Sequence, residues 1–312
     1  MATQTLAEAA KLIQNQIVVG VAEDIITTNP MWSAMPWTGY EGQAILVNRE
    51  NALGDAQNLA IGGTITAKAA ATFTQIPFSA TTTIGDAEIN GLVAAQSSAA
   101  GVNQLAIEIS SKAKSVGRLL QAGVATGTGT APALNSLHSL CDAGQYTTAS
   151  AGQAISLLLL DQLLDLVKSK DGQVDWLMMP ARTLRNYKAL VRSLGGITET
   201  MAFTMPNGTT RNVSVYEGIP IFQNDYLSIA ETANGAALTG GALASVYAGC
   251  WDDGSNKVGV AMIHPMGVPA GIAIETVGVA ETKDEVITRV KSYSNFASFN
   301  RKGVARLTSI NN

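Results

Sequence analysis

The residues that most often bind metal ions are scarce in this sequence. It has two histidines, and His138 lies three residues before Cys141, a spacing that places both side chains on one face of a helix. Two ligands are too few for a zinc site, and no third histidine or cysteine lies nearby in the sequence. The second histidine, His264, precedes a proline in an apolar run, and we expect it to be structural. The sequence therefore predicts no metal site.

Three other patterns could serve catalysis or phosphate binding, and each of them is incomplete. Residues 124–132 are rich in Gly and Thr like a phosphate-binding loop, but no Gly-Lys-Ser/Thr follows and no strand directly precedes them. No Gly-x-Ser-x-Gly turn supports a serine nucleophile. Asp252 and Asp253 precede Gly254 in a predicted turn, where aspartates usually bond to their own backbone. We therefore predict no catalytic residues, no cofactor and no enzymatic activity.

A stripe of basic residues has helical spacing. Its members are separated by three, three and four positions and follow Pro180, so a helix opened by this proline carries them along one face. Three interpretations are open: a solvated helix face, an inter-subunit salt-bridge surface around a symmetry axis, and a weak contact with DNA. The four residues are Arg182, Arg185, Lys188 and Arg192.

The composition indicates a folded protein with few charges. Of 312 residues, 46% are hydrophobic and 14% are charged, whereas about 25% is the usual charged fraction of soluble domains. A chain that buries much of its surface against copies of itself tolerates this deficit. The net charge of -4 lacks the basic excess of dedicated nucleic-acid binders.

The sequence also bears on the compartment. Its two cysteines are far apart, which fits a reducing environment. The first twelve residues have no signal-peptide pattern, and the most apolar stretch, residues 155–167, is too short to span a membrane. We therefore expect a protein made in the cytosol that has no membrane partner.

Hydrophobic periodicity predicts three helices, at residues 84–121, 155–168 and 180–194. The first is the longest, with Asp86 as its N-cap and Gly123 at its end. Strands are predicted at 43–50, at 65–78, at 174–179, in a hairpin over 201–216 that turns at 206–208, and repeatedly from 219 to 310. This order of elements predicts an α+β fold without repeats.

Two segments contain too few core residues to be stable without packing on other parts of a protein. Trp32 and Trp37 lie with two prolines within eight residues, which suggests an extended arm that packs on a neighbour or on its own domain. The strands at 43–50 and 65–78 flank a stretch rich in Gly, Ala, Asn and Gln, and a two-stranded ribbon alone is marginally stable. We therefore expect the ribbon to lie on a neighbouring subunit. Its candidate interface residues are Ile45, Arg49 and Lys68.

Three stretches resemble the major capsid proteins of tailed bacteriophages with the Hong Kong 97-like fold. FSATTTIGDAEIN, together with the following GRLLQAG and the Thr126-Gly127-Thr128-Gly129 loop, is similar to the spine helix of that family and the loop after it. VDWLMMPARTLRNYKALVRSLGG is similar to its buried strand, Pro-opened helix and terminal glycines. EGIPIFQNDYL is similar to the strand that enters its final sheet.

The resemblance implies five regions: an N-terminal arm at 1–40, an extended E-loop hairpin at 41–80, a P-domain spine helix at 81–122, an A domain at 123–249 and P-domain β-strands at 250–312. It implies a virion protein that assembles in the bacterial host cytoplasm into pentamers and hexamers of an icosahedral shell. That shell would enclose double-stranded DNA through weak, non-specific contacts. Separate scaffolding, portal and decoration proteins would be its other partners.

Two departures from the family pattern matter. The arm begins almost at Met1, so we expect a separate scaffolding protein or none. Lys68 is the only lysine between Lys11 and Lys112, and no matching asparagine or carboxylate is identified, so the covalent cross-link of some members is not carried over and Lys68 is interpreted as a surface charge. An encapsulin-type nanocompartment shell is the alternative function, and a soluble α+β enzyme is a remote one.

Overall fold

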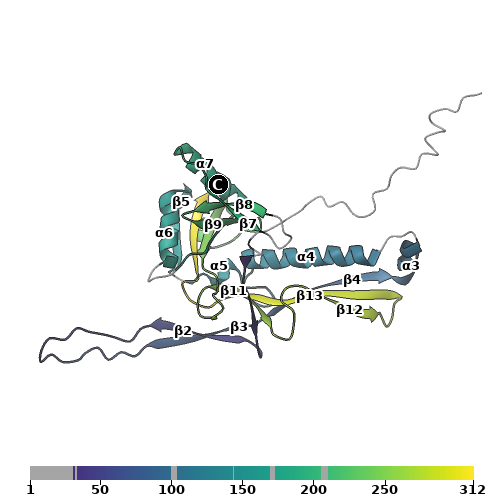
Figure 1. Ribbon diagram of the computed structural model, residues 1–312, viewed down its shortest axis with the longest axis horizontal. Coiled ribbons are helices and arrows are strands. Elements are labelled where there is room, and N and C mark those ends of the chain that lie inside the picture. The colour runs from purple at the N-terminus through teal and green to yellow at the C-terminus, as the bar shows by residue number, and fades with distance from the viewer. Residues whose placement is uncertain (1–30, 32–33, 100–103, 143, 169–172, 205–209) are drawn as a thin grey trace, which may run out of the picture.

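The computed structural model describes residues 31, 34–99, 104–142, 144–168, 173–204 and 210–312. Its strands form a seven-stranded, a five-stranded and a two-stranded sheet. The molecule is elongated, with a two-stranded hairpin projecting at one end and a long helix lying along a finger of strands at the other (Figure 1). The α+β class expected from the sequence is confirmed.

The seven-stranded sheet forms the largest core, and two amphipathic helices cover one of its faces. These are α6 (Leu157–Lys168) and α7 (Ala181–Ser193), which pack in the same hydrophobic cluster as alternate strand residues. Apolar residues at helical spacing produce this one-sided burial. In their order across the sheet the strands are β5 (Tyr146–Ala154), β14 (Val304–Asn311), β10 (Leu243–Gly249), β6 (Trp176–Met179), β9 (Ile219–Gln223), β8 (Thr210–Tyr216) and β7 (Thr200–Thr204).

The five-stranded sheet extends from the body into the finger because its central strand, β13, is 14 residues long. One end of β13 pairs with β11 and the other end pairs with β4 and β12. Helix α4 (Gln104–Thr126) covers the finger through Val116 and Leu120, which pack with Val290. The strands are β1 (Trp37–Tyr40), β11 (Val260–Pro265), β13 (Glu285–Ser298), β12 (Ala273–Val279) and β4 (Thr81–Asn90).

The remaining elements are short or project from the body. Strands β2 (Ile45–Ala52) and β3 (Thr72–Phe78) form the hairpin. Helix α3 (Gly91–Ala99) lies at the end of the finger, and α5 (Leu137–Leu140) and the 3-10 turn η1 (Ala233–Gly235) lie in the body. Among the described helices, none is long and apolar enough to cross a membrane.

The predicted start of the long helix is wrong. Residues Thr81–Asn90 form β4, whose burial alternates with the period of two that is typical of a strand. Asp86 is therefore no N-cap but faces Arg289 across the β4–β13 ladder. A run of three threonines and an isoleucine favours this strand, and its partner β13 lies about 200 residues later in the sequence, outside the reach of local periodicity.

The predicted helix end is also wrong, because α4 continues through Gly123 to Thr126. A Cβ atom at Gly123 would lie 2.4 Å from Cδ1 of Leu134. The glycine is therefore required for the close approach of the next segment and does not terminate the helix. Lys68 lies in the loop between β2 and β3, because β3 begins only at Thr72.

Other predicted elements are confirmed. Pro180 is the N-cap of α7, and the helix ends one residue before Leu194, as expected from the two glycines that follow. Strand β6 is buried along its whole length. Strands β7 and β8 pair as an antiparallel hairpin, and its predicted turn at 206–208 lies outside the described residues.

Candidate assembly surfaces

The base of the β2–β3 hairpin is seated on the body of its own subunit. Val47 and Phe78 are buried, and Ile45 and Ile76 are half-buried beside them. They pack with residues of β1 and β11 and of the end of β13. Because side chains alternate along a strand, the inward face of β2 continues from Val47 to Arg49. Ile45, a predicted interface residue, therefore lies against its own subunit.

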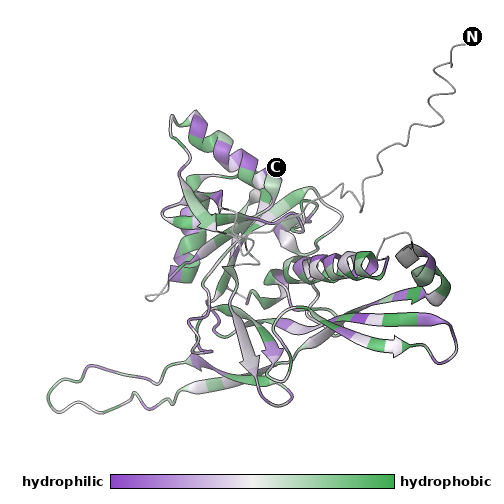
Figure 2. Cartoon of the chain, turned by 45° about the vertical axis from the view of Figure 1, so that its right-hand side comes forward, coloured by the Kyte–Doolittle hydropathy of each residue, from purple (hydrophilic) through white to green (hydrophobic). Residues whose placement is uncertain are grey.

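Beyond Arg49 the hairpin has no core. We call residues 50–73 the arm; among them, only positions 67 and 71 are even half-buried. Figure 2 shows hydrophobic segments recurring along this projecting part of the chain. Five large apolar side chains on it are exposed: Leu53 (73%), Leu59 (47%), Ile61 (108%), Ile65 (60%) and Phe73 (66%).

Large apolar side chains in this number are uncommon on the exposed surface of a soluble monomer. The backbone of the arm is held by its own contacts: the Gln57 side chain accepts hydrogen bonds from the amides of Thr66 and Ala67, and the amide of Asp55 donates to the carbonyl of Ala69. Lys68 is exposed in this segment. These hydrogen bonds join the two sides of the hairpin to each other.

Arg49 points into the body of its own subunit and not toward solvent. Its Nη1 donates to Oδ2 of Asp142 at 2.9 Å, and its Nη2 donates to the backbone carbonyl of Ser298 at 2.6 Å. The side chain is 9% exposed. Burial lowers the pKa of the guanidinium, and the Asp142 carboxylate opposes this shift. Arg49, a predicted interface residue, is engaged within its own subunit, and a contact of its own with a neighbouring subunit stays a prediction.

Of the two tryptophans in the predicted N-terminal arm at 1–40, a segment separate from the hairpin arm at 50–73, the structure describes only Trp37. Trp37 begins β1, is half-buried, and packs against the core cluster that contains Trp176 and Phe296. Its ring lies 6.3 Å from that of His264, centroid to centroid. Trp37 therefore contacts its own subunit, which was one of the two interpretations. Trp32 lies outside the described residues.

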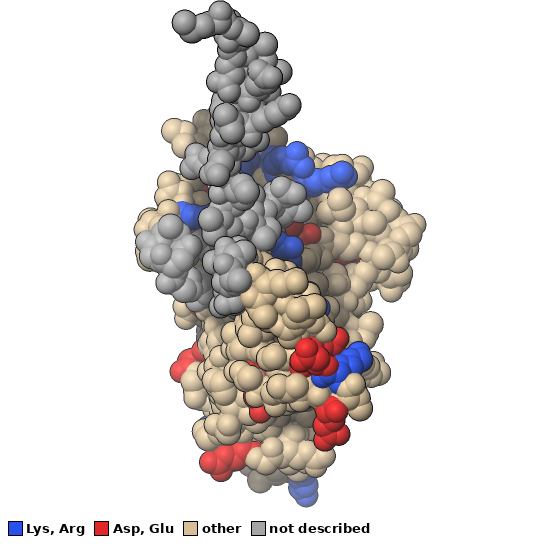
Figure 3. All heavy atoms as spheres, turned by 90° about the vertical axis from the view of Figure 1, so that its right-hand side faces the viewer, with Lys and Arg blue, Asp and Glu red and all other residues tan. Residues whose placement is uncertain are grey.

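The basic stripe of α7 faces away from the sheet. Thr183, Leu184 and Tyr187 form the buried side of the helix. Arg182, Arg185 and Arg192 are exposed and Lys188 is half-exposed. Within the described part of the chain, none of the four forms a salt bridge with a carboxylate. Figure 3 shows basic side chains near the top of the molecule, where α7 lies, and most acidic ones in the lower half of this face.

The end of the finger is a surface that the sequence analysis missed. Leu92 and Val93 of α3 are exposed, as are Ile274, Val277 and Val279 of β12. The outer face of the finger is polar: Asp86 accepts two hydrogen bonds from Arg289, at 2.9 Å each, and Glu275 pairs with Lys291. The assignment of residues 84–90 to a helix concealed this face, and a period-two interpretation of TTTIGDAEIN would have found it.

Both cysteines are buried and His138 is half-buried. Desolvation raises the pKa of the Cys141 thiol to about 12 and that of Cys250 to about 11, which keeps both thiols protonated. Desolvation and the Arg306 charge lower the pKa of His138. Across the residues that the structure describes, no three His, Cys, Asp or Glu side chains are grouped as a metal site would require.

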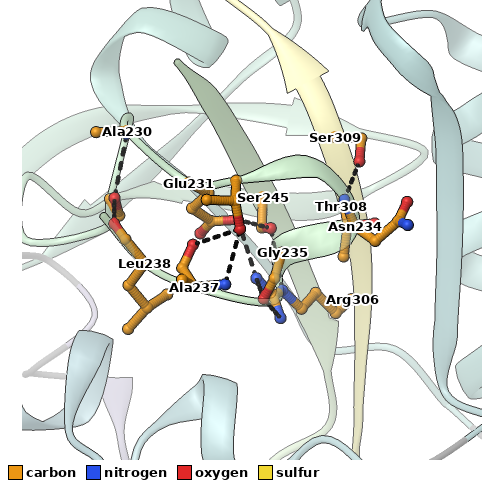
Figure 4. A network of polar contacts seen from close by, with 12 residues as sticks. Ala230, Glu231, Asn234, Gly235, Ala237, Leu238, Ser245, Arg306, Thr308 and Ser309 are labelled. Atoms are coloured by element: carbon orange, nitrogen blue, oxygen red, sulfur yellow. Dashed lines mark hydrogen bonds and ion pairs between the residues drawn. The ribbon is translucent and has the colours of Figure 1, made fainter. Parts of the chain in front are cut away.

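A buried ion pair fixes the loop around η1 to the seven-stranded sheet (Figure 4). Nη2 of Arg306 donates to Oε2 of Glu231 at 2.9 Å, and both side chains are 2% exposed. Nε of Arg306 donates to the hydroxyl of Ser245 at 3.0 Å, and that hydroxyl donates to Glu231. The guanidinium also donates to the carbonyl of Gly235 at 3.3 Å. The polar groups of Arg306, Glu231 and Ser245 thus bond to groups of the same chain, and the network stabilises the core.

The fold is similar to that of known proteins, although the sequence is not. No protein-family model and no curated protein matches the sequence. A chain of the holo-SrpI encapsulin complex from Synechococcus elongatus is similar in structure, with a TM-score of 0.72 and 14% identity, covering 100% of this chain and 97% of that one. The cyanophage A-1(L) capsid chain has a TM-score of 0.72 at 12% identity, covering 99% and 100%. The capsid chain of a native GTA particle has a TM-score of 0.66 at 10% identity, covering 99% of each chain.

These likenesses span the whole of this chain and of its counterparts. The chain therefore has the Hong Kong 97-like fold expected from the sequence. The proteins that share this fold with it include chains of two capsids and of an encapsulin complex.

Proposed function

We propose that this chain is the major capsid protein of a tailed bacteriophage, which self-assembles into the pentamers and hexamers of an icosahedral shell around double-stranded DNA. It would be a structural virion protein without enzymatic activity, assembled in the cytoplasm of the bacterial host. Separate scaffolding, portal and decoration proteins would be further partners, and contact with the DNA would be weak and non-specific. The Hong Kong 97-like fold supports this proposal.

The single observation that carries it is the exposed arm. A monomer gains nothing from holding five large apolar side chains in water on a ribbon that cannot bury them. Burying a side chain of this size stabilises an interface by about 1.5–3 kcal/mol before the cost of association. The arm would therefore lie on a neighbouring subunit, and each subunit would receive the arm of another. Contacts of this heterologous kind close into rings and shells when the rotation between subunits permits.

The test replaces residues 53–71, which carry four of the five exposed apolar side chains, without disturbing the base of the hairpin. Residues Ala52 and Thr72 are paired across the hairpin, so residues 53–71 can be exchanged for a two-residue Asn-Gly turn, which suits an antiparallel hairpin. The subunit should keep its thermal midpoint but form neither capsomers nor particles. As a matched control, Val258→Ser removes an exposed apolar side chain (43%) away from both the arm and α7 and should leave assembly intact. Normal particles from the arm-replaced chain would contradict the proposal.

A second candidate function is an encapsulin-type nanocompartment shell, which shares the fold. The specific observation in its favour is the encapsulin likeness, which has a TM-score of 0.72 over 100% of this chain. The two functions differ in what the particle contains. Particles purified from the native source should protect double-stranded DNA from nuclease if the chain is a capsid protein, and should contain a second protein species if it is an encapsulin.

The stripe on α7 has the charge expected of an inter-subunit surface. Its three neighbouring like-charge pairs cost an isolated helix about 0.6–1.5 kcal/mol in total. Arg182 lies in the first turn, where a cation opposes the helix dipole. These costs are relieved when carboxylates of a neighbouring subunit approach. We propose this role for Arg182, Arg185, Lys188 and Arg192.

Reversing two charges tests that role. The double variant Arg185→Glu/Lys188→Glu should block assembly, while Lys257→Glu, an exposed lysine elsewhere on the molecule, should not. Assembly of the unaltered chain should weaken as salt is raised through the range that screens surface pairs. If the double variant instead forms normal particles with less DNA, the stripe contacts DNA. If neither property changes, the stripe is a solvated face.

A further inference from the structure

The arm leaves the body at a sharply defined point. Along the inward face of β2, Ile45 and Val47 pack on the apolar base, and Arg49 is the next residue in line. Among the described residues, no hydrogen bond or ion pair joins positions 50–74 to any part of the chain outside the hairpin. Arg49 is therefore the outermost anchor of the hairpin on its own subunit.

The two acceptors of Arg49 come from different parts of the fold. Asp142 follows α5 and lies 93 residues away in the sequence, and Ser298 ends β13 at a separation of 249 residues. The guanidinium is planar, so two N–H groups that donate to two separate acceptors fix its orientation as well as its position. With the side chain 9% exposed, water competes little for these bonds. We call Arg49, Asp142 and the carbonyl of Ser298 the Arg49 clamp.

The clamp lies at the base of a long lever. About twelve residues of extended chain separate Arg49 from the end of the arm, which is roughly 40 Å at the rise of a β-strand. A rotation of about 10° at the clamp would displace the end by about 7 Å. A displacement of this size would carry the apolar side chains of the arm off any complementary surface on a neighbour.

We infer that Arg49 is the positioning residue that sets the direction of the arm, and that it does so before assembly. The inference rests on the proposed function, because a fixed direction matters only if the arm must meet a neighbouring subunit. The apolar base alone does not supply this control. Val47 and Phe78 make non-directional contacts, which hold the base in place but leave rotation about it open.

Spin labels at the end of the arm and on the body measure the direction of the arm. Cysteines introduced by Ala60→Cys and Ala189→Cys are exposed positions for labelling. The native Cys141 and Cys250 are buried and stay unlabelled. Pulsed electron spin resonance on unassembled full-length subunits should give one narrow distance distribution for the unaltered clamp. Arg49→Met, which keeps the length of the side chain and its apolar stem, should broaden that distribution by about 7 Å or more.

Conservative variants separate positioning from folding. Arg49→Lys keeps the charge but cannot donate in the planar fork geometry, and it should give an intermediate width. Asp142→Asn removes the ion pair at a residue whose side chain is 35% exposed, and it tests the clamp should Arg49→Met fail to fold. Lys68→Met removes a cation from the arm itself and should leave the distribution unchanged. An unchanged width for both Arg49→Met and Asp142→Asn would overturn the inference.

Assembly yield, measured on the same proteins without labels, completes the test. The yield should be highest for the unaltered chain, lower for Arg49→Lys and lowest for Arg49→Met. A broadened distribution with an undiminished yield would overturn the positioning role while leaving the proposed function intact. If the unaltered chain gives a narrow distance distribution but does not assemble, the proposed function is wrong. The positioning role, which rests on that function, then falls with it.

Discussion

The buried Arg306–Glu231 pair allows a quantitative prediction for the fold. Arg306→Met would remove the cation beside the Glu231 side chain, which is 2% exposed, and would leave the carboxylate the hydrogen bond from the Ser245 hydroxyl. Removing one partner of a buried pair costs about 3–5 kcal/mol, which is a large part of the about 5–15 kcal/mol that stabilises a typical domain. The variant should therefore lose much of its free energy of unfolding.

The double variant Arg306→Met/Glu231→Met should be more stable than Arg306→Met by about 2 kcal/mol, because apolar replacement of both charges removes the uncompensated carboxylate. Ser245 and the carbonyl of Gly235 still lose their partner, so recovery should be incomplete. Arg182→Met, an exposed control, should change stability by less than about 0.5 kcal/mol.

Urea unfolding of arm-replaced subunits, which stay unassembled, provides the assay. Trp176 is fully buried and lies 5.2 Å from Trp251 between ring centroids, so its fluorescence should report loss of the core. If the effects of Arg306→Met and of Glu231→Met add without coupling in the double variant, the pair does not act as a unit. The ion pair would then not be what fixes the loop around η1.

Local geometry yields three further predictions. Because burial raises the pKa of Cys141 to about 12 and of Cys250 to about 11, thiol reagents at pH 8 should label the native chain only as fast as it unfolds, whereas rapid labelling would contradict their burial. Gly127→Ala should lower the free energy of unfolding by about 1–3 kcal/mol, because the new Cβ would lie 2.2 Å from the carbonyl oxygen of Leu134. Gly117→Ala, whose Cβ would lie 3.6 Å from Cδ1 of Ile272, should instead raise it by up to about 1 kcal/mol. Equal effects of the two substitutions on urea unfolding would refute this contrast. Hydrogen bonds from Arg289 lower the pKa of Asp86. The ionised Asp86 therefore stabilises the fold at pH values above the usual aspartate pKa, and this stabilisation is lost as the pH falls through the lowered pKa. Asp86→Asn should abolish this part of the acid dependence of the thermal midpoint.

Local signals in the sequence account for much of the body. Pro180 and the glycines after Leu194 bound α7, and a short apolar run predicts β6, because each of these signals acts within a few residues. Hydrophobic periodicity wrongly predicts helix for residues 84–90, because the conformation of this segment is decided by its pairing with β13 and by its packing under α4. Tertiary pairing of this kind overrides local propensity.

The candidate assembly surfaces also divide into features that local sequence predicts and features that depend on distant residues. The composition of the arm predicts a ribbon without a core, and the spacing of the α7 stripe predicts its exposed face. The inward direction of Arg49 was not predictable, because its acceptors lie 93 and 249 residues away. The exposed apolar residues of β12 and α3 were not predicted, because β12 and β4, the strand before α3, join the same finger only through their separate pairing with β13.

Electron microscopy of the purified full-length chain, expressed with and without a candidate scaffolding protein, tests the central claim most directly. A shell subunit should give closed particles or ring-shaped capsomers, and the arm-replaced chain should give neither while remaining folded. A monodisperse monomer by light scattering at high concentration, in both expression conditions and with no particles on the grid, would contradict the account.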